Sequence, residues 1–141
     1  MKRMHLLLGI VFAAGVTVGA VAGHRVSAQE QLRAGKVLQR TELVGAKGME
    51  AILVLREVPA GGESGKHTQS GNEIVYVLDG SVTLEVQGKP ANTLKPGEAF
   101  QTTAGEVHNV KNASTSAGAK ALAFYVAKQG ARLEDLSVPA K

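Results

Sequence analysis

The sequence predicts an all-β domain that closes as a single jelly-roll barrel. Short apolar stretches recur between Gly, Pro, Asn and Asp turn signals, and no long amphipathic helical pattern interrupts them. An Asp79-Gly80 pair separates two of these stretches, which is a strong signal for a tight hairpin. A jelly-roll closure would also pair strand edges that an open sheet leaves exposed.

The predicted strands are short, and turn residues fix their ends. They cover residues 37–43, 51–58, 73–78, 81–86, 92–94, 100–103, 107–112 and 121–127. The turns between them are Gly45-Ala46-Lys47-Gly48, Pro59-Ala60-Gly61-Gly62, Asp79-Gly80, Gln87-Gly88-Lys89-Pro90, Lys95-Pro96-Gly97, Ala104-Gly105 and residues 113–118. Residues 29–36 are a polar lead-in, residues 37–127 form the barrel, and residues 128–141 are a polar tail with one helical turn near residues 133–136.

The first 28 residues have the order of a secretory signal peptide. Two basic residues precede an apolar run over residues 6–23, and Ser27-Ala28 suits a signal peptidase. We therefore expect residues 1–28 to be cleaved and the domain to be exported, either periplasmic or secreted. The alternative is an uncleaved membrane anchor, because the apolar run just reaches membrane-spanning length.

Cleavage would remove most of the net charge. The whole chain has 16 basic and 12 acidic residues, but three of the basic residues lie in the leader, which leaves a net charge of about +1. We therefore expect no nucleic-acid partner, and no membrane partner beyond the signal segment. The chain has no cysteine, so the exported domain must be stabilised by its core and not by disulfides.

Four side chains form a candidate metal site. His67, Gln69 and Glu73 occupy odd-numbered positions of one extended segment, so their side chains share a face. His108 follows a turn in the stretch over residues 97–112. Imidazole nitrogens and carboxylate oxygens bind first-row divalent metals, and an amide oxygen is a weaker ligand. The alternative is that the two histidines lie in a polar barrel mouth without binding metal.

The first of these stretches resembles the first motif of the cupin superfamily. That motif is a glycine, five residues, His-x-His, three or four residues, Glu, six residues and a glycine. Gly61, His67, Gln69, Glu73 and Gly80 occupy these positions in this sequence. Gln69 stands where the family usually has its second metal-binding histidine.

The second stretch resembles the second cupin motif, which is a glycine, five residues, Pro-x-Gly, two residues, His, three residues and Asn. Gly97, Gly105, His108 and Asn112 match it, and Thr103 replaces the usual proline. With its flanking strands, the similarity to a small single-domain cupin covers residues 37–127. We expect Asn112 and the motif glycines to have structural roles.

The resemblance implies a bound divalent metal. Cupins commonly hold iron, manganese, nickel, copper or zinc through three histidines and one glutamate. The corresponding ligands here are His67, Glu73 and His108, with Gln69 in the remaining position. Losing one imidazole shifts the expected preference away from copper towards iron or manganese, while nickel, zinc and copper remain alternatives.

The expected function follows from this site and is open between classes. One reading is a metal-dependent, dioxygenase-like oxidoreductase that acts on a small organic substrate. The alternatives are a small-molecule or metal-binding module without turnover, or a cupin isomerase or lyase. The sequence names neither the substrate nor the reaction.

The opposite face of the predicted strand over residues 73–78 is also apolar. If Glu73 points into the barrel, then Ile74, Tyr76 and Leu78 point out of it. This outer face is too apolar to be left in water. We expect it to pack either on a second copy, giving a homodimer, or on the N-terminal strands of the same chain.

Overall fold

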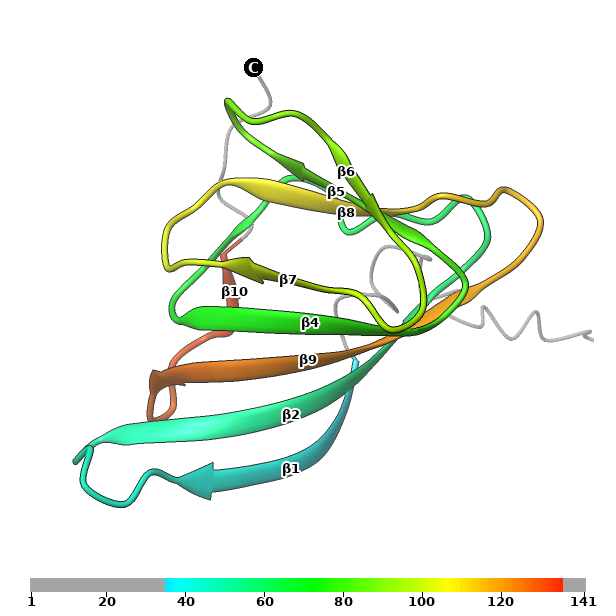
Figure 1. Cartoon of the computed structure of the whole chain (residues 1–141). Coiled ribbons are helices and arrows are strands. Elements are labelled where there is room, and N and C mark those ends of the chain that lie inside the picture. Colours follow the sequence, from blue (N-terminus) through cyan, green and yellow to red (C-terminus); the bar gives the residue numbers. More distant parts are fainter. Residues whose placement is uncertain (1–34, 136–141) are drawn as a thin grey trace, which may run out of the picture.

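The structure is a computed structural model that describes residues 35–135. In this range every regular element is a strand (Figure 1). The strands are β1 (Lys36–Glu42), β2 (Met49–Val58), β3 (Thr68–Gln69), β4 (Asn72–Asp79), β5 (Val82–Val86), β6 (Asn92–Leu94), β7 (Ala99–Thr102), β8 (His108–Asn112), β9 (Ala119–Lys128) and β10 (Glu134–Asp135).

The strands form two main antiparallel sheets. One has five strands in the order β1-β2-β9-β4-β7, and the other has three in the order β6-β5-β8. In the view of Figure 1 the three-stranded sheet lies above β4, β9 and β2 of the five-stranded sheet. A third, two-stranded sheet pairs β3 with β10. The all-β, jelly-roll prediction is confirmed.

The eight predicted strands are present, with ends shifted by a few residues. The sequence prediction missed two further strands, β3 and β10. The helical turn predicted near residues 133–136 is wrong, because Glu134 and Asp135 pair as β10 with Gln69 and Thr68 of β3. Two-residue strands carry no readable alternation, so only the tertiary pairing defines them.

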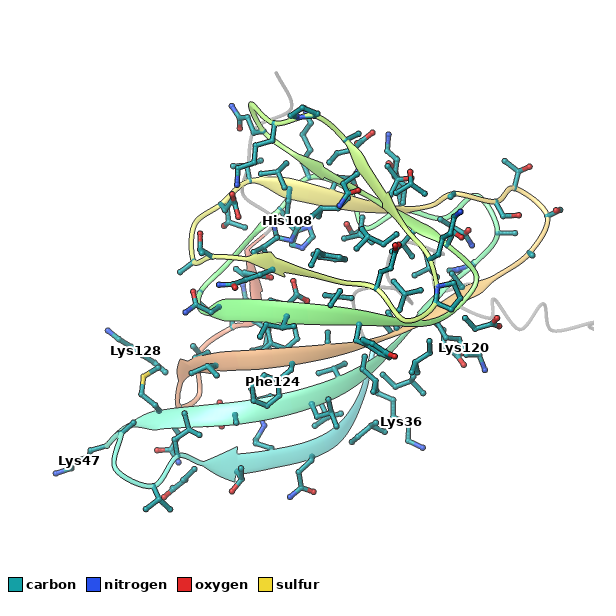
Figure 2. All side chains as sticks on the ribbon, viewed as in Figure 1. Lys36, Lys47, His108, Lys120, Phe124 and Lys128 are labelled. Atoms are coloured by element: carbon teal, nitrogen blue, oxygen red, sulfur yellow. The ribbon has the colours of Figure 1, made fainter. Side chains whose placement is uncertain are left out.

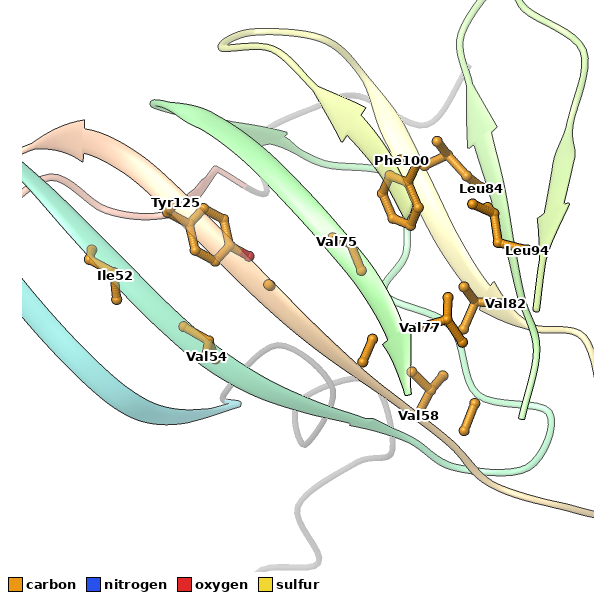
Figure 3. Packing of buried hydrophobic residues seen from close by; sticks show 13 residues of the cluster. Ile52, Val54, Val58, Val75, Val77, Val82, Leu84, Leu94, Phe100 and Tyr125 are labelled. Atoms are coloured by element: carbon orange, nitrogen blue, oxygen red, sulfur yellow. The ribbon is translucent and has the colours of Figure 1, made fainter. Parts of the chain in front are cut away.

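The core lies between the inward faces of the two main sheets. Alternate residues of β2, β4 and β9 point inward, as the period of two requires. Figure 3 shows this cluster, which comprises Ile52, Val54, Val58, Val75, Val77, Val82, Leu84, Leu94, Phe100, Ala119, Ala121, Ala123 and Tyr125. The inward positions of β9 are alanines apart from Tyr125. These small side chains leave space between the sheets.

Two glycines allow β4 to fit against β9. A Cβ atom at Gly71, just before β4, would collide with the carbonyl oxygen of Val126 on β9. Gly80 ends the strand with a φ of 71°, in the left-handed region that favours glycine. A side chain at either position would force β4 away from β9.

The outer face of the five-stranded sheet remains exposed. Ile74, Tyr76 and Leu78 of β4 are 47%, 45% and 42% exposed, and Phe124 of β9 is 40% exposed. Phe124 is labelled in Figure 2. Of the two alternatives for covering this face, packing of the N-terminal strands is wrong. β1 instead extends the same sheet by pairing with the edge of β2. A strand added at an edge cannot cover a face of its own sheet.

The predicted signal peptide, residues 1–28, lies outside the described residues, as does most of the lead-in. Between residues 35 and 135 there is no helix with the length and apolar character needed to cross a membrane.

Candidate metal centre

Backbone pairing brings the two histidines together. His67 and His108 form an antiparallel bridge in which each N–H donates to the other residue's carbonyl oxygen, at 2.9 and 3.0 Å. Side chains directly opposite each other in such a pair lie on the same face. The ring centroids are accordingly 4.2 Å apart. Figure 2 shows His108 pointing into the space between the sheets.

Glu73 reaches this space from the five-stranded sheet. It is an inward-facing, buried residue of β4, and its Oε2 atom lies 3.9 Å from Nε2 of His108. Thr102, its cross-strand partner on β7, donates a hydrogen bond from Oγ1 to Oε2 of Glu73 at 3.2 Å. The hydroxyl therefore holds the carboxylate in one orientation beside the histidine pair.

The candidate ligands do not share one extended segment, as the sequence pattern suggested. The extended segment is interrupted at Ser70 and Gly71, between β3 and β4. His67 bridges to His108 of the three-stranded sheet, whereas Glu73 lies on β4 of the five-stranded sheet. They meet across the interior of the barrel. Their odd-numbered positions on one predicted strand are therefore not the reason that they lie close together.

Each histidine is oriented by a backbone carbonyl. Nδ1 of His67 lies 2.9 Å from the carbonyl oxygen of Gly65, and Nδ1 of His108 lies 2.8 Å from that of Glu106. A carbonyl only accepts, so we assign the proton of each neutral ring to Nδ1. Burial lowers the pKa of His108, which favours the neutral ring. This leaves Nε2 as the atom able to bind a metal, in the arrangement usual for ligating histidines.

Gln69 is tied to the same network through Thr102. Its Nε2 donates to Oγ1 of Thr102, which in turn donates to Glu73. These hydrogen bonds orient the Gln69 amide so that its Nε2 atom faces Thr102 and its Oε1 atom points away from Thr102. Gln69 is only 2% exposed, so its amide cannot use bulk water.

Two buried side-chain atoms of the described residues have no hydrogen-bond partner, Oε1 of Gln69 and Nε2 of His108. Leaving a buried acceptor unpaired costs about 1–3 kcal/mol. Both atoms belong to candidate ligands, and both carry a lone pair that a cation would accept. The donor set therefore fits a divalent metal.

The geometry still needs adjustment to hold a metal. Within residues 35–135, no three His, Cys, Asp or Glu side chains are grouped closely enough to form a metal site as they stand. Glu73 is bonded to Thr102 and lies 3.9 Å from His108. Metal binding would require side-chain movements that bring the ligand atoms to about 2.0–2.2 Å from one point.

The three ionisable candidates line one cavity between the sheets. Its volume is about 40 Å³, larger than the roughly 10–15 Å³ that one water molecule needs. Gln69 lies outside its lining. The lining residues are Arg56, Val58, Ser64, His67, Glu73, Val75, Val82, Phe100, His108, Val110 and Ala121.

Sequence reasoning missed two residues of this site, Thr102 and Arg56. The role of Thr102 depends on its register with Glu73, which no local pattern reveals. Arg56 had a signal, because it occupies an inward position in the alternation of β2.

Asn112 has the structural role expected for it. Its Nδ2 donates to the carbonyl oxygens of Val58 and Pro59 at 3.0 Å and of Ala117 at 2.8 Å, and its Oδ1 accepts from the N–H of Ser114. The side chain therefore holds the end of β8 against the end of β2.

Solved structures support the fold. The chain is similar to the DMSP lyase DddQ from Ruegeria pomeroyi DSS-3, with a TM-score of 0.54 and 22% identity over 68% of this chain and 46% of that one. It is also similar to an RmlC-like cupin from Shewanella frigidimarina NCIMB 400, with a TM-score of 0.51 and 16% identity over 68% and 86% of the two chains. A third similar structure is a Bacillus halodurans protein, with a TM-score of 0.52 and 17% identity over 59% of this chain and 67% of that one.

These likenesses establish the fold alone, because all three identities are below 25%. The chain spans less than half the length of the Ruegeria protein. No curated protein matches it significantly in sequence. The family profile described as "Cupin domain" matches residues 54–125, just over half of the 141 residues. The chain therefore belongs to the cupin family.

Proposed function

We propose that this chain is an exported cupin that binds iron or manganese through His67, Glu73 and His108, with Gln69 as a weaker fourth ligand. We propose further that it acts as a dioxygenase-like oxidoreductase on a small organic substrate. The observation that carries the metal proposal is the pair of unpaired buried atoms, Oε1 of Gln69 and Nε2 of His108.

The donor set favours oxidative metal chemistry. Two imidazoles and one carboxylate match the ligand set of non-haem Fe(II) oxygenases, whose remaining coordination positions stay open. When bound, the metal would supply a Lewis-acidic centre that binds and polarises substrate. Replacing one imidazole by an amide weakens the site for copper more than for iron or manganese.

The residues around the site would orient and shield the reaction. The carbonyl oxygens of Gly65 and Glu106 hold the two imidazole rings, and the Thr102 hydroxyl holds Glu73. Much of the cavity wall is apolar, which would limit the water around the reacting groups. Among the residues that line the cavity, Glu73 is the sole carboxylate, so it is the candidate proton acceptor, a role that would require it to leave the metal.

The test is the metal content of protein expressed from the full sequence and purified without chelator, measured by plasma mass spectrometry. We expect about one equivalent of iron or manganese, lost in a His67→Ala/His108→Ala variant whose circular dichroism is unchanged. If neither protein takes up metal after incubation with Fe(II), Mn(II), Ni(II) or Zn(II), the metal proposal fails. The intact mass of the same sample reports whether residues 1–28 are removed.

A second candidate function is a binding module without turnover, favoured by the amide at position 69. Oxygen uptake by the metal-loaded protein separates the two functions. Gln69→His is expected to raise metal occupancy in both cases, but only an oxygenase would then consume oxygen with a substrate. An isomerase or lyase would convert substrate at this site without oxygen uptake.

We also propose that the outer face of the five-stranded sheet forms a homodimer. Ile74, Tyr76, Leu78 and Phe124 together expose an apolar surface on neighbouring strands β4 and β9. The same surface on a second copy would cover it through a two-fold contact. Light scattering on the purified protein tests this directly, and a monomeric mass would exclude it.

A further inference from the structure

A buried serine lies beside His67 in the cavity wall. Ser64 is 5% exposed and lines the same cavity as His67. Its Oγ atom lies 3.4 Å from Nδ1 of His67, the nitrogen that also lies 2.9 Å from the carbonyl oxygen of Gly65. A hydroxyl can donate or accept, so its role towards His67 depends on where its own proton points.

The backbone pairing around Ser64 is irregular. Two isolated bridges flank this residue, Glu63–Lys111 and His67–His108, and between them the segment of Ser64 has one residue more than the facing segment. The N–H of Ser64 donates to the Val110 carbonyl at 2.9 Å, but the N–H of Val110 donates to Oγ of Ser64 at 3.0 Å. An extra residue of this kind changes the direction of a neighbouring side chain and is common beside active sites. The pairing with Val110 holds the Ser64 hydroxyl in place next to the His67 ring.

Asn109 is the acceptor for the hydroxyl proton of Ser64. Two acceptors lie within hydrogen-bond distance of Oγ, namely Oδ1 of Asn109 at 3.2 Å and the Gly65 carbonyl oxygen at 3.1 Å. The Gly65 oxygen already accepts from Nδ1 of His67, whereas within residues 35–135 no other donor reaches Oδ1 of Asn109. Asn109 is 5% exposed, so a donor from the protein is needed. Directing the Ser64 proton to Asn109 therefore satisfies both oxygens.

Two carboxylates fix the orientation of the Asn109 amide. Its Nδ2 donates to Oε2 of Glu63 at 2.9 Å and to Oε2 of Glu85 at 3.2 Å. Lys111 lies 2.9 Å from Oε1 of Glu85, and the hydrogen bond from Lys111 lowers the pKa of Glu85. Ionised carboxylates only accept, so the amide nitrogen faces them and Oδ1 faces Ser64. Exposed charges thus set the orientation of a buried amide.

With its proton directed to Asn109, the Ser64 hydroxyl acts as an acceptor towards His67. Its lone pairs then accept from the N–H of Val110 and from Nδ1–H of His67. The other neutral form of His67 would place an Nδ1 lone pair against the oxygens of Ser64 and Gly65. Turning the hydroxyl to donate to that lone pair would leave Oδ1 of Asn109 buried without a donor, which is unfavourable.

We infer that Ser64 and Asn109 are positioning residues that keep the proton of the neutral His67 ring on Nδ1. Nε2 of His67 is thereby left as the atom with a free lone pair. Hydrogen bonds to the non-ligating nitrogen fix the tautomer and the ring orientation of metal-binding histidines. The benefit for metal binding rests on the proposed function, whereas the tautomer itself does not require bound metal.

The test is nitrogen-15 NMR of the full chain labelled in its histidine rings, in EDTA and at a pH where the rings are neutral. The two ring-nitrogen shifts report which nitrogen carries the proton. We expect Nδ1–H for His67 in the unmodified protein. Ser64→Ala should lower the ratio of Nδ1–H to Nε2–H about 2–10-fold, as expected for one lost neutral hydrogen bond while the Gly65 carbonyl remains. The ratio at His108, which is oriented by Glu106, should not change.

Ser70→Ala is a matched control, because Ser70 lies three residues after His67 and Ser64 lies three residues before it. Ser70 is exposed, and its hydroxyl donates to the carbonyl oxygen of Arg132. Its removal should leave the His67 tautomer unchanged. Ser64→Thr keeps the hydroxyl and should restore the ratio of the unmodified protein. Asn109→Leu removes the acceptor for the Ser64 proton and should shift the ratio in the same direction as Ser64→Ala, which covers the case in which Ser64→Ala does not fold.

A His67 ring that carries its proton on Nε2 in the unmodified protein would overturn the inference. An unchanged ratio in folded Ser64→Ala and Asn109→Leu would also overturn it, even if both variants are less stable, because the two side chains would then have a structural role alone. Titration of the same samples with Mn(II) separates this result from the fate of the metal proposal. We expect Ser64→Ala to weaken Mn(II) binding about tenfold or more. A tautomer shift in a protein that binds no metal supports the inference and contradicts the metal proposal, and intact metal binding with an unchanged tautomer does the reverse.

Discussion

Replacing Gln69 by leucine tests whether its unpaired amide oxygen lowers the stability of the metal-free protein and contributes to metal binding. In the metal-free protein, Oε1 of Gln69 is a buried acceptor without a partner, which costs about 1–3 kcal/mol. Leucine is similar in size and removes that atom. It also removes the hydrogen bond to Thr102, worth about 1 kcal/mol, while Thr102 keeps its bond to Glu73. We therefore expect Gln69→Leu to raise the free energy of unfolding by about 0–2 kcal/mol.

The assay is urea unfolding of both proteins, once in EDTA and once in excess Mn(II). In EDTA the leucine variant should equal or exceed the unmodified protein in stability. In Mn(II) the order should reverse, because the unmodified protein keeps its amide ligand and gains more from metal binding. If Gln69→Leu lowers stability in EDTA by more than about 1 kcal/mol, then Oε1 is not an unpaired atom and the reasoning is refuted.

Three further predictions concern other parts of the molecule. Thr102→Val should lower the free energy of unfolding by about 2–4 kcal/mol, because it leaves the Gln69 amide donor unpaired and removes the hydrogen bond to Glu73. The control Thr83→Val, which breaks an exposed hydrogen bond with Thr93, should change it by no more than about 0.5 kcal/mol, and equal losses in urea unfolding would contradict this prediction. In EDTA, the free energy of unfolding should be highest above pH 6.5 and decrease as the pH falls below it, because burial lowers the pKa of His108 in the folded protein and the unfolded chain therefore takes up the proton first. Urea midpoints that do not change with pH, or whose pH dependence is the same in His108→Gln, would contradict this prediction. Phe124→Asp should convert a dimer into a folded monomer by light scattering, and an unchanged mass would remove this face from the interface.

The strands were predictable because their ends are marked by turn residues. Asp79-Gly80 places the end of β4 and the start of β5 almost unaided, since glycine adopts the left-handed backbone conformation there without strain. β3 and β10 were not predictable, because two-residue strands show no alternation and exist only through their mutual pairing. Local signals determine where strands end, and tertiary contacts determine which short segments join them.

The candidate site was predictable in its residue types but not in its construction. Motif spacing singled out His67, Glu73 and His108, and the structure places all three on one cavity. Their convergence depends on a bridge between distant segments and on a register between β4 and β7. Register is a property of the assembled sheet, so Thr102 could not be recognised beforehand. Arg56 could have been, since alternation along β2 places it on the apolar side.

The departures from good packing in the described part of the molecule are a cavity and two buried acceptors, one of which is linked to the cavity through the hydrogen bonds of Thr102. Both buried charges of β2 have partners, Glu50 with Arg40 at 2.8 Å and Arg56 with the Tyr125 hydroxyl at 2.7 Å. Between the sheets, by contrast, the described residues line a cavity that includes His108, whose Nε2 has no hydrogen-bond partner, and Oε1 of Gln69, outside that lining, is the other buried atom without one. A sequence selected for stability alone would fill the space beside Ala121 and replace Gln69 by an apolar residue. Such local failures are expected at functional sites, which is why we propose the cavity as a binding site. The same reasoning requires the protein to be more stable with its ligands bound than without them.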